Sequence, residues 1–277
     1  MRDLAANPKL FSINSATLGF QQPVEKVIDD VARAGFGGFS PWRREVEGHA
    51  VKAIGRRIRE AGLQIPSYCR STSLPAATAA EFAANIADNK MAIDDAALLG
   101  AQSFMFVVGG LPAGSKDIAA ARAQVKEATA ALAEHGQKVG VKIALEPLHP
   151  VYAADRSCLT LLSEALDWCD EINHPNLGVC VDVYHVWWNP NLASDLTRAG
   201  SRIISFHVCD WLVPMRDVLM DRGMMGDGVI DLPRLREMVE AAGYDGLVEA
   251  EIFSSENWWK RPPSETLSVI KSRLGAI

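Results

Sequence analysis

Acidic residues and a histidine mark the ends of four apolar segments in the second half of the chain. In chain order they are Glu146, Asp182, His207 and the pair Glu249 and Glu251. Each segment is rich in Ile, Val, Leu or Phe, so these side chains are expected at the border of a buried core. A buried charge without a partner is very costly, so each carboxylate needs a cation or a hydrogen-bond donor beside it.

These side chains would form a metal site if the fold brought them together. Three carboxylates and one imidazole make a mainly oxygen-donor set, which suits Mn²⁺, Mg²⁺ or Co²⁺, with Zn²⁺ as a further candidate. Converging carboxylates also repel one another strongly unless a cation lies between them. The pattern therefore predicts one divalent metal ion, held by Glu146, Asp182, His207 and a glutamate of the last segment. Glu249 and Glu251 would share one face of a strand, so spacing alone allows either.

Short apolar stretches alternate with longer helical segments along the chain. The longer segments have apolar residues at helical spacing, as at Val24, Val27 and Val31, and several end in a glycine such as Gly35. The short stretches have the composition of buried parallel strands and cover residues 10–14, 37–41, 64–69, 103–108, 142–147, 178–185, 203–209 and 247–253.

Eight strand-and-helix units predict an α/β protein with the (β/α)8 TIM-barrel fold. An open doubly wound sheet is the rival fold, but no G-x-G-x-x-G turn follows the first strand. The chain has no linker-like stretch, so we expect a single domain over residues 1–277. The carboxyl ends of all the strands would then meet at one rim, where the catalytic residues of such barrels lie.

Further polar and aromatic residues follow the predicted strands. Trp42 and Arg70 lie at the ends of the second and third strands, and His149 and Arg156 lie beyond the fifth. We expect Trp42, His149 and Arg156 to contact a substrate, because loops at this rim carry the binding residues. His185, three residues after Asp182, is expected either to contact the substrate or to support a ligand.

Composition limits the classes of partner. The net charge of -6 comes without a basic stripe, which argues against a nucleic-acid partner. The first residues lack the apolar core of a secretory signal, and no stretch has the roughly 18 apolar residues of a membrane helix, so no membrane partner is expected. The five cysteines have no C-x-x-C spacing and are expected as reduced thiols, so we expect a cytoplasmic protein.

Several motifs resemble the sugar phosphate isomerase/epimerase superfamily, the xylose isomerase-like TIM-barrel group known as AP endonuclease family 2. The resemblance covers essentially the whole chain. The motifs are Ala144-Leu145-Glu146-Pro147, the D-x-x-H of Asp182 and His185, Phe206-His207, Gly226-Asp227-Gly228-Val229-Ile230-Asp231, and the final 246–253 strand.

This resemblance implies roles for individual residues. It implies a metal site made of Glu146, Asp182, His207 and Glu251, because Glu251 precedes Ile252-Phe253 as the family's ligand does. Glu249 would then support the site from behind. It further implies that Glu146 and Glu251 form the acid/base pair. In the family an arginine after the histidine strand contacts substrate oxygens, and here Arg216 and Arg222 both lie in that loop.

The function expected from the residues and the resemblance is that of a metal-dependent sugar isomerase or epimerase. A metal ion would stabilise an enediolate while one glutamate removes a proton next to the carbonyl of a ketose or related polyol and the other returns it. The partner would be a small-molecule carbohydrate. A homo-oligomer, either a dimer or a tetramer, stays open.

Three other functions stay open at this point. A metal-dependent dehydratase or lyase acting on a keto-inositol, a dehydroshikimate-like or a 3-keto-glycoside substrate would use the same residues but release water. An apurinic endonuclease would need three metal ions and more histidines than the six present, of which His49, His135 and His174 are expected at the surface. A non-catalytic sugar-binding barrel would have no use for a complete ligand set.

Overall fold

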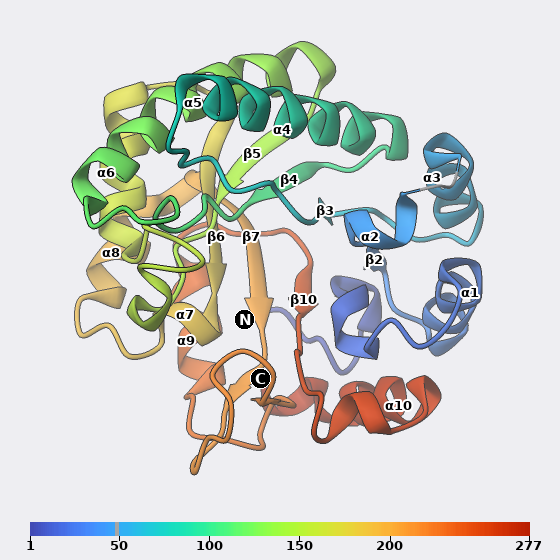
Figure 1. The fold of residues 1–277 in the computed structure, drawn as a ribbon. Coiled ribbons are helices and arrows are strands. Elements are labelled where there is room, and N and C mark those ends of the chain that lie inside the picture. The colour runs from blue at the N-terminus through green and yellow to red at the C-terminus, as the bar shows by residue number, and fades with distance from the viewer. Residues whose placement is uncertain (48–49) are drawn as a thin grey trace.

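Eight parallel strands form the centre of the computed structural model, which describes residues 1–47 and 50–277 (Figure 1). They are hydrogen-bonded in the order β2-β1-β10-β7-β6-β5-β4-β3, and isolated bridges from Gly38 to Gln64 and from Trp42 to Cys69 connect the two ends. The predicted (β/α)8 barrel is therefore confirmed. The strands are β1 Phe11–Asn14, β2 Gly38–Ser40, β3 Ser67–Tyr68, β4 Ser103–Phe106, β5 Lys142–Leu145, β6 Leu177–Asp182, β7 Ile203–Val208 and β10 Val248–Ala250.

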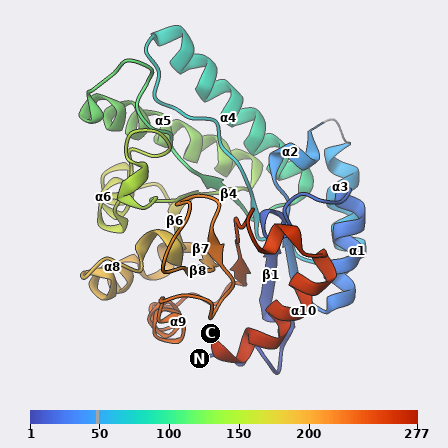
Figure 2. The same cartoon turned by 60° about the horizontal axis from the view of Figure 1, so that its bottom comes forward.

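Helices surround the barrel on its outside (Figure 2). The long ones are α1 Val24–Ala34, α3 Val51–Glu60, α4 Ala79–Leu99, α5 Ile118–Val139, α6 Leu162–Ile172, α8 Leu192–Ala199, α9 Leu232–Ala241 and α10 Pro263–Arg273. The short ones are α2 Arg43–Val46 and α7 Val183–Val186, with 3-10 turns η1 Pro8–Leu10, η2 Ser15–Leu18, η3 Pro150–Tyr152, η4 Gly200–Arg202, η5 Trp258–Lys260 and η6 Leu274–Ala276. In the described part of the chain, no helix is both long enough and apolar enough to span a membrane.

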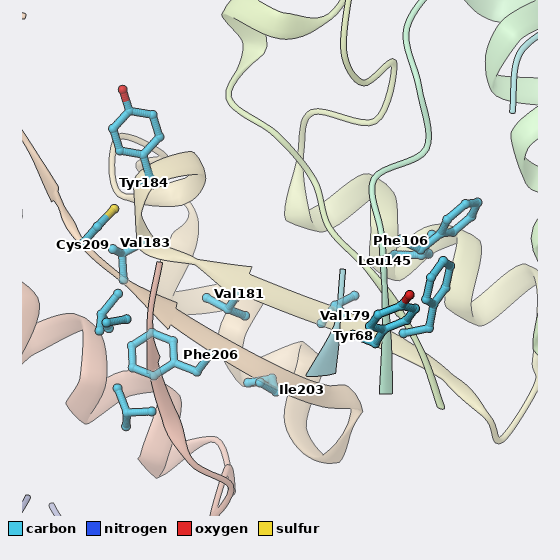
Figure 3. Packing of buried hydrophobic residues seen from close by; sticks show 14 of the residues in the cluster. Tyr68, Phe106, Leu145, Val179, Val181, Val183, Tyr184, Ile203, Phe206 and Cys209 are labelled. Carbon is cyan, nitrogen blue, oxygen red and sulfur yellow. The ribbon is translucent and has the colours of Figure 1, made fainter. Parts of the chain in front are cut away.

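Alternation along the strands sends apolar side chains outward and polar ones inward. Val179 and Val181 of β6 lie beside Ile203 and Phe206 of β7 and pack in the large apolar cluster shared with the helices (Figure 3). Cys180, between the two valines, belongs to a separate small cluster inside the barrel. Because successive strand residues point to opposite faces, Asp182 then points inward as well.

The sixth strand is shorter than the apolar run that contains it. The run covers residues 178–185, but β6 ends at Asp182, the acidic residue expected at the strand end, and α7 begins at Val183. The cause is the Asp182 side chain, whose Oδ1 accepts a hydrogen bond from the backbone N–H of Tyr184 at 2.9 Å. Such a contact satisfies an amide of the first helical turn and starts a helix. His185 is thereby moved from a strand to a helical turn above the barrel.

His135, His174 and the chain ends lie away from the carboxyl ends of the strands. His135 on α5 forms a 2.7 Å contact with Asp94. His174 is half-buried, and His49 lies outside the described residues. Arg236 of α9 ties the two ends of the chain together, because its guanidinium donates to the carbonyl oxygens of Arg2 and Ile277, each at 2.5 Å.

A small antiparallel sheet, which the sequence did not predict, follows the seventh barrel strand. It pairs β8 Asp210–Trp211 with β9 Arg222–Gly223. The buried carboxylate of Asp210 organises the loop after β9, because it accepts from the backbone N–H groups of Gly226, Gly228 and Ile230 at 2.9, 2.9 and 3.0 Å. The N–H of Trp211 donates to it as well, at 2.9 Å.

Gly228 has no room for a side chain at this place. A Cβ there would lie 2.1 Å from the Trp211 carbonyl oxygen. The glycine-rich motif at residues 226–231 therefore has a structural role, which is to let its backbone wrap the Asp210 carboxylate.

We predict that Asp210→Ala destabilises the protein. Four backbone N–H groups would lose their acceptor, and we expect the free energy of unfolding to fall by roughly 3 kcal/mol. Urea unfolding measures this loss. Asp210→Asn keeps one acceptor oxygen and should lose less, so equal midpoints for the wild type and the alanine variant would contradict the role given to Asp210.

Candidate metal centre and catalytic cavity

Four predicted ligand residues meet at the carboxyl ends of adjacent strands. Glu146 follows β5, Asp182 ends β6, His207 lies on β7 and Glu251 follows β10. One ligand atom from each lies within 4.8 Å of the others, and all four side chains are buried. The barrel therefore brings together the residues that the sequence pattern singled out.

The donor atoms in this cluster fit a bound cation. Oε1 of Glu146 and both ring nitrogens of His207 are buried, and no hydrogen-bond partner for them occurs in residues 1–47 and 50–277. Nδ1 of His207 lies 3.9 Å from Glu146 Oε1 and 3.7 Å from Glu251 Oε2. Buried polar atoms normally have partners, so orphaned atoms that face one another indicate a place for an ion.

Cys180 offers an alternative ligand to the same cluster. Its sulfur can be grouped with Glu146 and His207 at comparable distances. Burial raises the pKa of the Cys180 thiol to about 12, so the thiol keeps its proton, while only the thiolate is a good metal ligand. The set of three carboxylates and one imidazole is therefore the better description of the site.

Glu249 lies on β10, two residues before Glu251 and deeper in the barrel. Its carboxylate accepts hydrogen bonds from Asn14 Nδ2 at 3.1 Å, Ser40 Oγ at 2.6 Å and Ser67 Oγ at 3.2 Å. It also lies 3.4 Å from Nε2 of His207, on the side of the ring opposite to the ligand cluster. A carboxylate behind the imidazole orients the ring and leaves Nδ1 facing the cluster. The first three strands thus supply the polar partners of Glu249, and Ser40 and Ser67 are two that the sequence pattern did not indicate.

The arginine that reaches the cluster is Arg222. Its Nη1 lies 2.9 Å from Asp182 Oδ2 and 3.4 Å from Glu251 Oε2. Its guanidinium carbon lies 4.3 Å from the centre of the Tyr184 ring and 4.9 Å from that of Phe253, so the arginine is held on two aromatic faces.

Arg216, the other candidate of that loop, is directed elsewhere. It forms an ion pair with Asp221 and has a side chain that is 56% exposed, outside the residues that line the cavity. Both arginines follow β7 in the sequence, and only the folded arrangement, in which Arg222 lies on β9, separates them.

His185 lies beside Arg222 and is neutral. Burial is the main cause that lowers its pKa to about 3, and the charge of Arg222 acts in the same direction. Its Nδ1 accepts the backbone N–H of His149 at 3.1 Å, and its Nε2 lies 3.1 Å from Arg222 Nη2. The ring of His149 packs against Trp188 and Trp211 outside the cavity lining.

A cavity opens above the ligand cluster, with about 470 Å³ of space including its open side. Of the predicted substrate contacts, Trp42, Arg156, His185 and Arg222 line it. The walls also contain Tyr152, Phe253 and Arg70, which the sequence analysis had not proposed as contacts.

The two glutamates of the cluster have different affinities for a proton. Burial, reinforced by the nearby charge of Glu251, raises the pKa of Glu146 to about 8. Burial also favours protonation of Glu251, but His207 and Arg222 face it and hold its pKa below the ordinary value. A pair of carboxyl groups with separated pKa values is the arrangement that acid/base catalysis requires.

The comparisons with known proteins agree with this fold. The family description "xylose isomerase-like TIM barrel" matches residues 28–273. The chain is 27% identical over 167 residues to the ketose 3-epimerase of Arthrobacter globiformis, covering 59% of this chain and 54% of that protein. It is 29% identical over 156 residues to the inosose isomerase of Bacillus licheniformis, covering 54% and 53%. The matches thus span about half the length of these curated relatives.

A solved structure is similar over nearly the whole chain. The crystal structure of a Sinorhizobium meliloti protein has a TM-score of 0.92 and 47% sequence identity, and the match covers 95% of this chain and 96% of that one.

We predict that the metal-free protein loses stability as the pH rises from about 5 to about 8 because of Glu146. In this window the folded state holds a proton that the unfolded chain, with a glutamate pKa of about 4.3, has already lost. The free energy of unfolding should therefore fall, by up to about 1.4 kcal/mol per pH unit.

Urea unfolding of chelator-treated wild type and Glu146→Gln over this pH range measures the effect. The glutamine variant has no such proton, so its pH slope should be smaller, and a saturating divalent cation should flatten the slope of the wild type. Identical slopes in the two metal-free proteins would contradict the raised pKa.

Proposed function

Because this chain belongs to the xylose isomerase-like TIM-barrel family, we propose that it is a divalent-metal-dependent sugar isomerase or epimerase. The substrate class is a ketose or related polyol, and the reaction moves a proton at the carbon next to the carbonyl. The observation that carries this proposal is the convergence of Glu146, Asp182, His207 and Glu251 at the floor of a cavity. The names of the curated relatives, a ketose 3-epimerase and an inosose isomerase, support it.

The four cluster residues would hold the ion, with His207 contributing Nδ1. Mn²⁺, Mg²⁺ and Co²⁺ suit this oxygen-rich set, and Zn²⁺ is a further candidate. When bound, the ion would supply Lewis-acid chemistry, which polarises the substrate carbonyl and makes the neighbouring C–H bond more acidic. Glu249 and Asn14 would orient the ligands, because Glu249 faces the back of the His207 ring and Asn14 Nδ2 donates to Glu251 Oε1 at 3.1 Å.

Glu146 and Glu251 are the proposed acid/base pair. The lower pKa of Glu251 favours it as the group that removes the proton. Glu146 then returns a proton, to the opposite face of the same carbon in an epimerisation or to the adjoining carbon in an isomerisation.

The residues around the pair have supporting roles in the proposal. Arg222 and the neutral His185 would bind substrate oxygens beside the glutamates. Trp42 and Phe253, whose ring centres lie 5.4 Å apart, would form an apolar wall that keeps water from the reacting carbon.

We predict that the purified protein binds about one divalent ion per chain. Glu251→Gln should lose most of this metal, because it removes a ligand. Glu249→Gln should keep all four ligands and weaken binding by about 10–100-fold, through the loss of orientation of His207. Elemental mass spectrometry and metal titration measure both effects. If the protein bound no ion even in excess metal, the proposed site would be wrong. If Glu249→Gln lost more metal than Glu251→Gln, Glu249 would be the ligand and Glu251 the supporting residue.

We predict that the metal-loaded protein exchanges a substrate proton with solvent. Ketoses and keto-inositols incubated in deuterated water should take up deuterium next to the carbonyl, as observed by proton NMR. Glu146→Gln and Glu251→Gln should each lower this rate by about 10²–10⁴-fold, the usual contribution of a general acid or base. Glu134→Gln, an exposed change on α5, is the matched control. Exchange that survives both site variants would refute the acid/base assignment, and loss of water in the product mass would point to the lyase.

A further inference from the structure

Two arginines of the cavity have no acidic partner among the residues that the structure describes. Arg70 follows β3 and Arg156 follows η3, and both line the cavity above the ligand cluster. Neither side chain forms an ion pair or a hydrogen bond with any other residue that the structure describes. Arg222 differs from them, because its charge is offset by Asp182 and Glu251. The cavity therefore contains two positive charges that no acidic side chain of the described residues pairs with.

Arg156 is held in place, but one of its hydrogen-bond donors has no acceptor among the described residues. Its guanidinium carbon lies 5.7 Å from the centre of the Tyr152 ring, and the Tyr152 hydroxyl is fixed by donating to the Val218 carbonyl oxygen. Its Nε is buried and has no acceptor in the described part of the chain. A buried donor without an acceptor is costly, so this N–H group would gain from a hydrogen bond to an oxygen atom of a bound ligand.

Arg70 lies within electrostatic range of both Arg156 and the catalytic cluster. Burial is the main cause that lowers the pKa of its guanidinium, the charge of Arg156 lowers it further, and Glu146 opposes the shift. Arg70 is exposed, so solvent screens part of its charge, but two like charges that line one cavity still favour an anionic ligand between them. Arginine is also the residue best shaped to bind a carboxylate or a phosphate through two parallel hydrogen bonds.

We infer that the substrate of this enzyme carries an anionic group, a carboxylate or a phosphate, which Arg70 and Arg156 bind while the carbonyl end faces Glu146 and Glu251. This inference rests on the proposed function for the identity of the cavity as the substrate site. It narrows the substrate class from neutral ketoses to sugar acids or sugar phosphates.

The test compares three compounds that differ only at C6, namely D-fructose, D-fructuronate and D-fructose 6-phosphate. Isothermal titration calorimetry on the metal-loaded protein should show at least one anionic compound binding about ten-fold or more tightly than D-fructose. The preferred anion distinguishes a carboxylate site from a phosphate site. Added salt should weaken the preference, because charge pairs at an open cavity are screened.

Variants assign the preference to the two arginines. Arg70→Gln and Arg156→Gln should each remove most of the preference, and Arg70→Lys should keep part of it, since the charge remains but the planar fork is lost. Arg56→Gln removes one charge from the outer helix α3 and should bind as the wild type does. Thermal unfolding of each variant checks that it is folded.

Several outcomes would overturn the inference. These are equal binding of D-fructose and the anions, a preference that survives in the Arg70→Gln/Arg156→Gln double variant, or no binding of either anion at millimolar concentration. Binding requires no turnover, so a binding preference for the anions without deuterium exchange would refute only the proposed reaction. Deuterium exchange of neutral ketoses without a binding preference for the anions would refute only the inference.

Discussion

The repulsion between carboxylates that converge inside the barrel is the constraint on which the rest of the site depends. Glu146, Asp182, Glu249 and Glu251 are all at most 5% exposed, so water screens their charges little. The protein offsets these charges unequally. Asp182 and Glu251 face Arg222, and Glu249 accepts hydrogen bonds from the first three strands. Glu146 keeps an oxygen without a partner in the described residues, and this residual imbalance is the physical basis for a cation.

This compensation depends on a loop outside the barrel sheet. Arg222 lies on β9, which pairs with β8, and β8 begins at Asp210, whose carboxylate gathers the backbone amides of the following loop. Asp210, which stabilises the loop, and Arg222, which faces Asp182 and Glu251, therefore belong to one small sheet with its loop. A change that loosened the loop would alter the charge balance of the cluster without touching any ligand, so stability and electrostatics are coupled here.

The barrel and its inward-facing acids could be predicted from the sequence because both follow from local regularities. Alternation of apolar and polar residues along each strand is a property of neighbouring positions, and parallel strands carry their carboxyl ends to one rim. The choice between Arg216 and Arg222 could not be predicted, because both follow the seventh barrel strand and only the fold separates them: Arg216 pairs with Asp221, whereas β9 carries Arg222 to the cluster. Spacing alone could not separate Glu249 from Glu251, since it gives both the same face, and only the family resemblance favoured Glu251 as the ligand. In the structure the hydrogen bonds that Ser40 and Ser67 donate to Glu249 distinguish the two glutamates.

The charges of the cavity are arranged in order of depth. The clustered carboxylates lie at the floor, and Arg222 lies beside them with its charge offset. Arg70, which is exposed, and the half-buried Arg156 line the same cavity and have no acidic partner among the described residues. Such an order acts on a substrate with two different ends. An anionic end drawn to Arg70 and Arg156 leaves the other end to meet the glutamates, and orientation of this kind lowers the entropic part of the barrier. In the proposed function, charge order and acid/base separation would serve one purpose, because a carbon held between Glu146 and Glu251 would meet one group that accepts a proton and another that donates one.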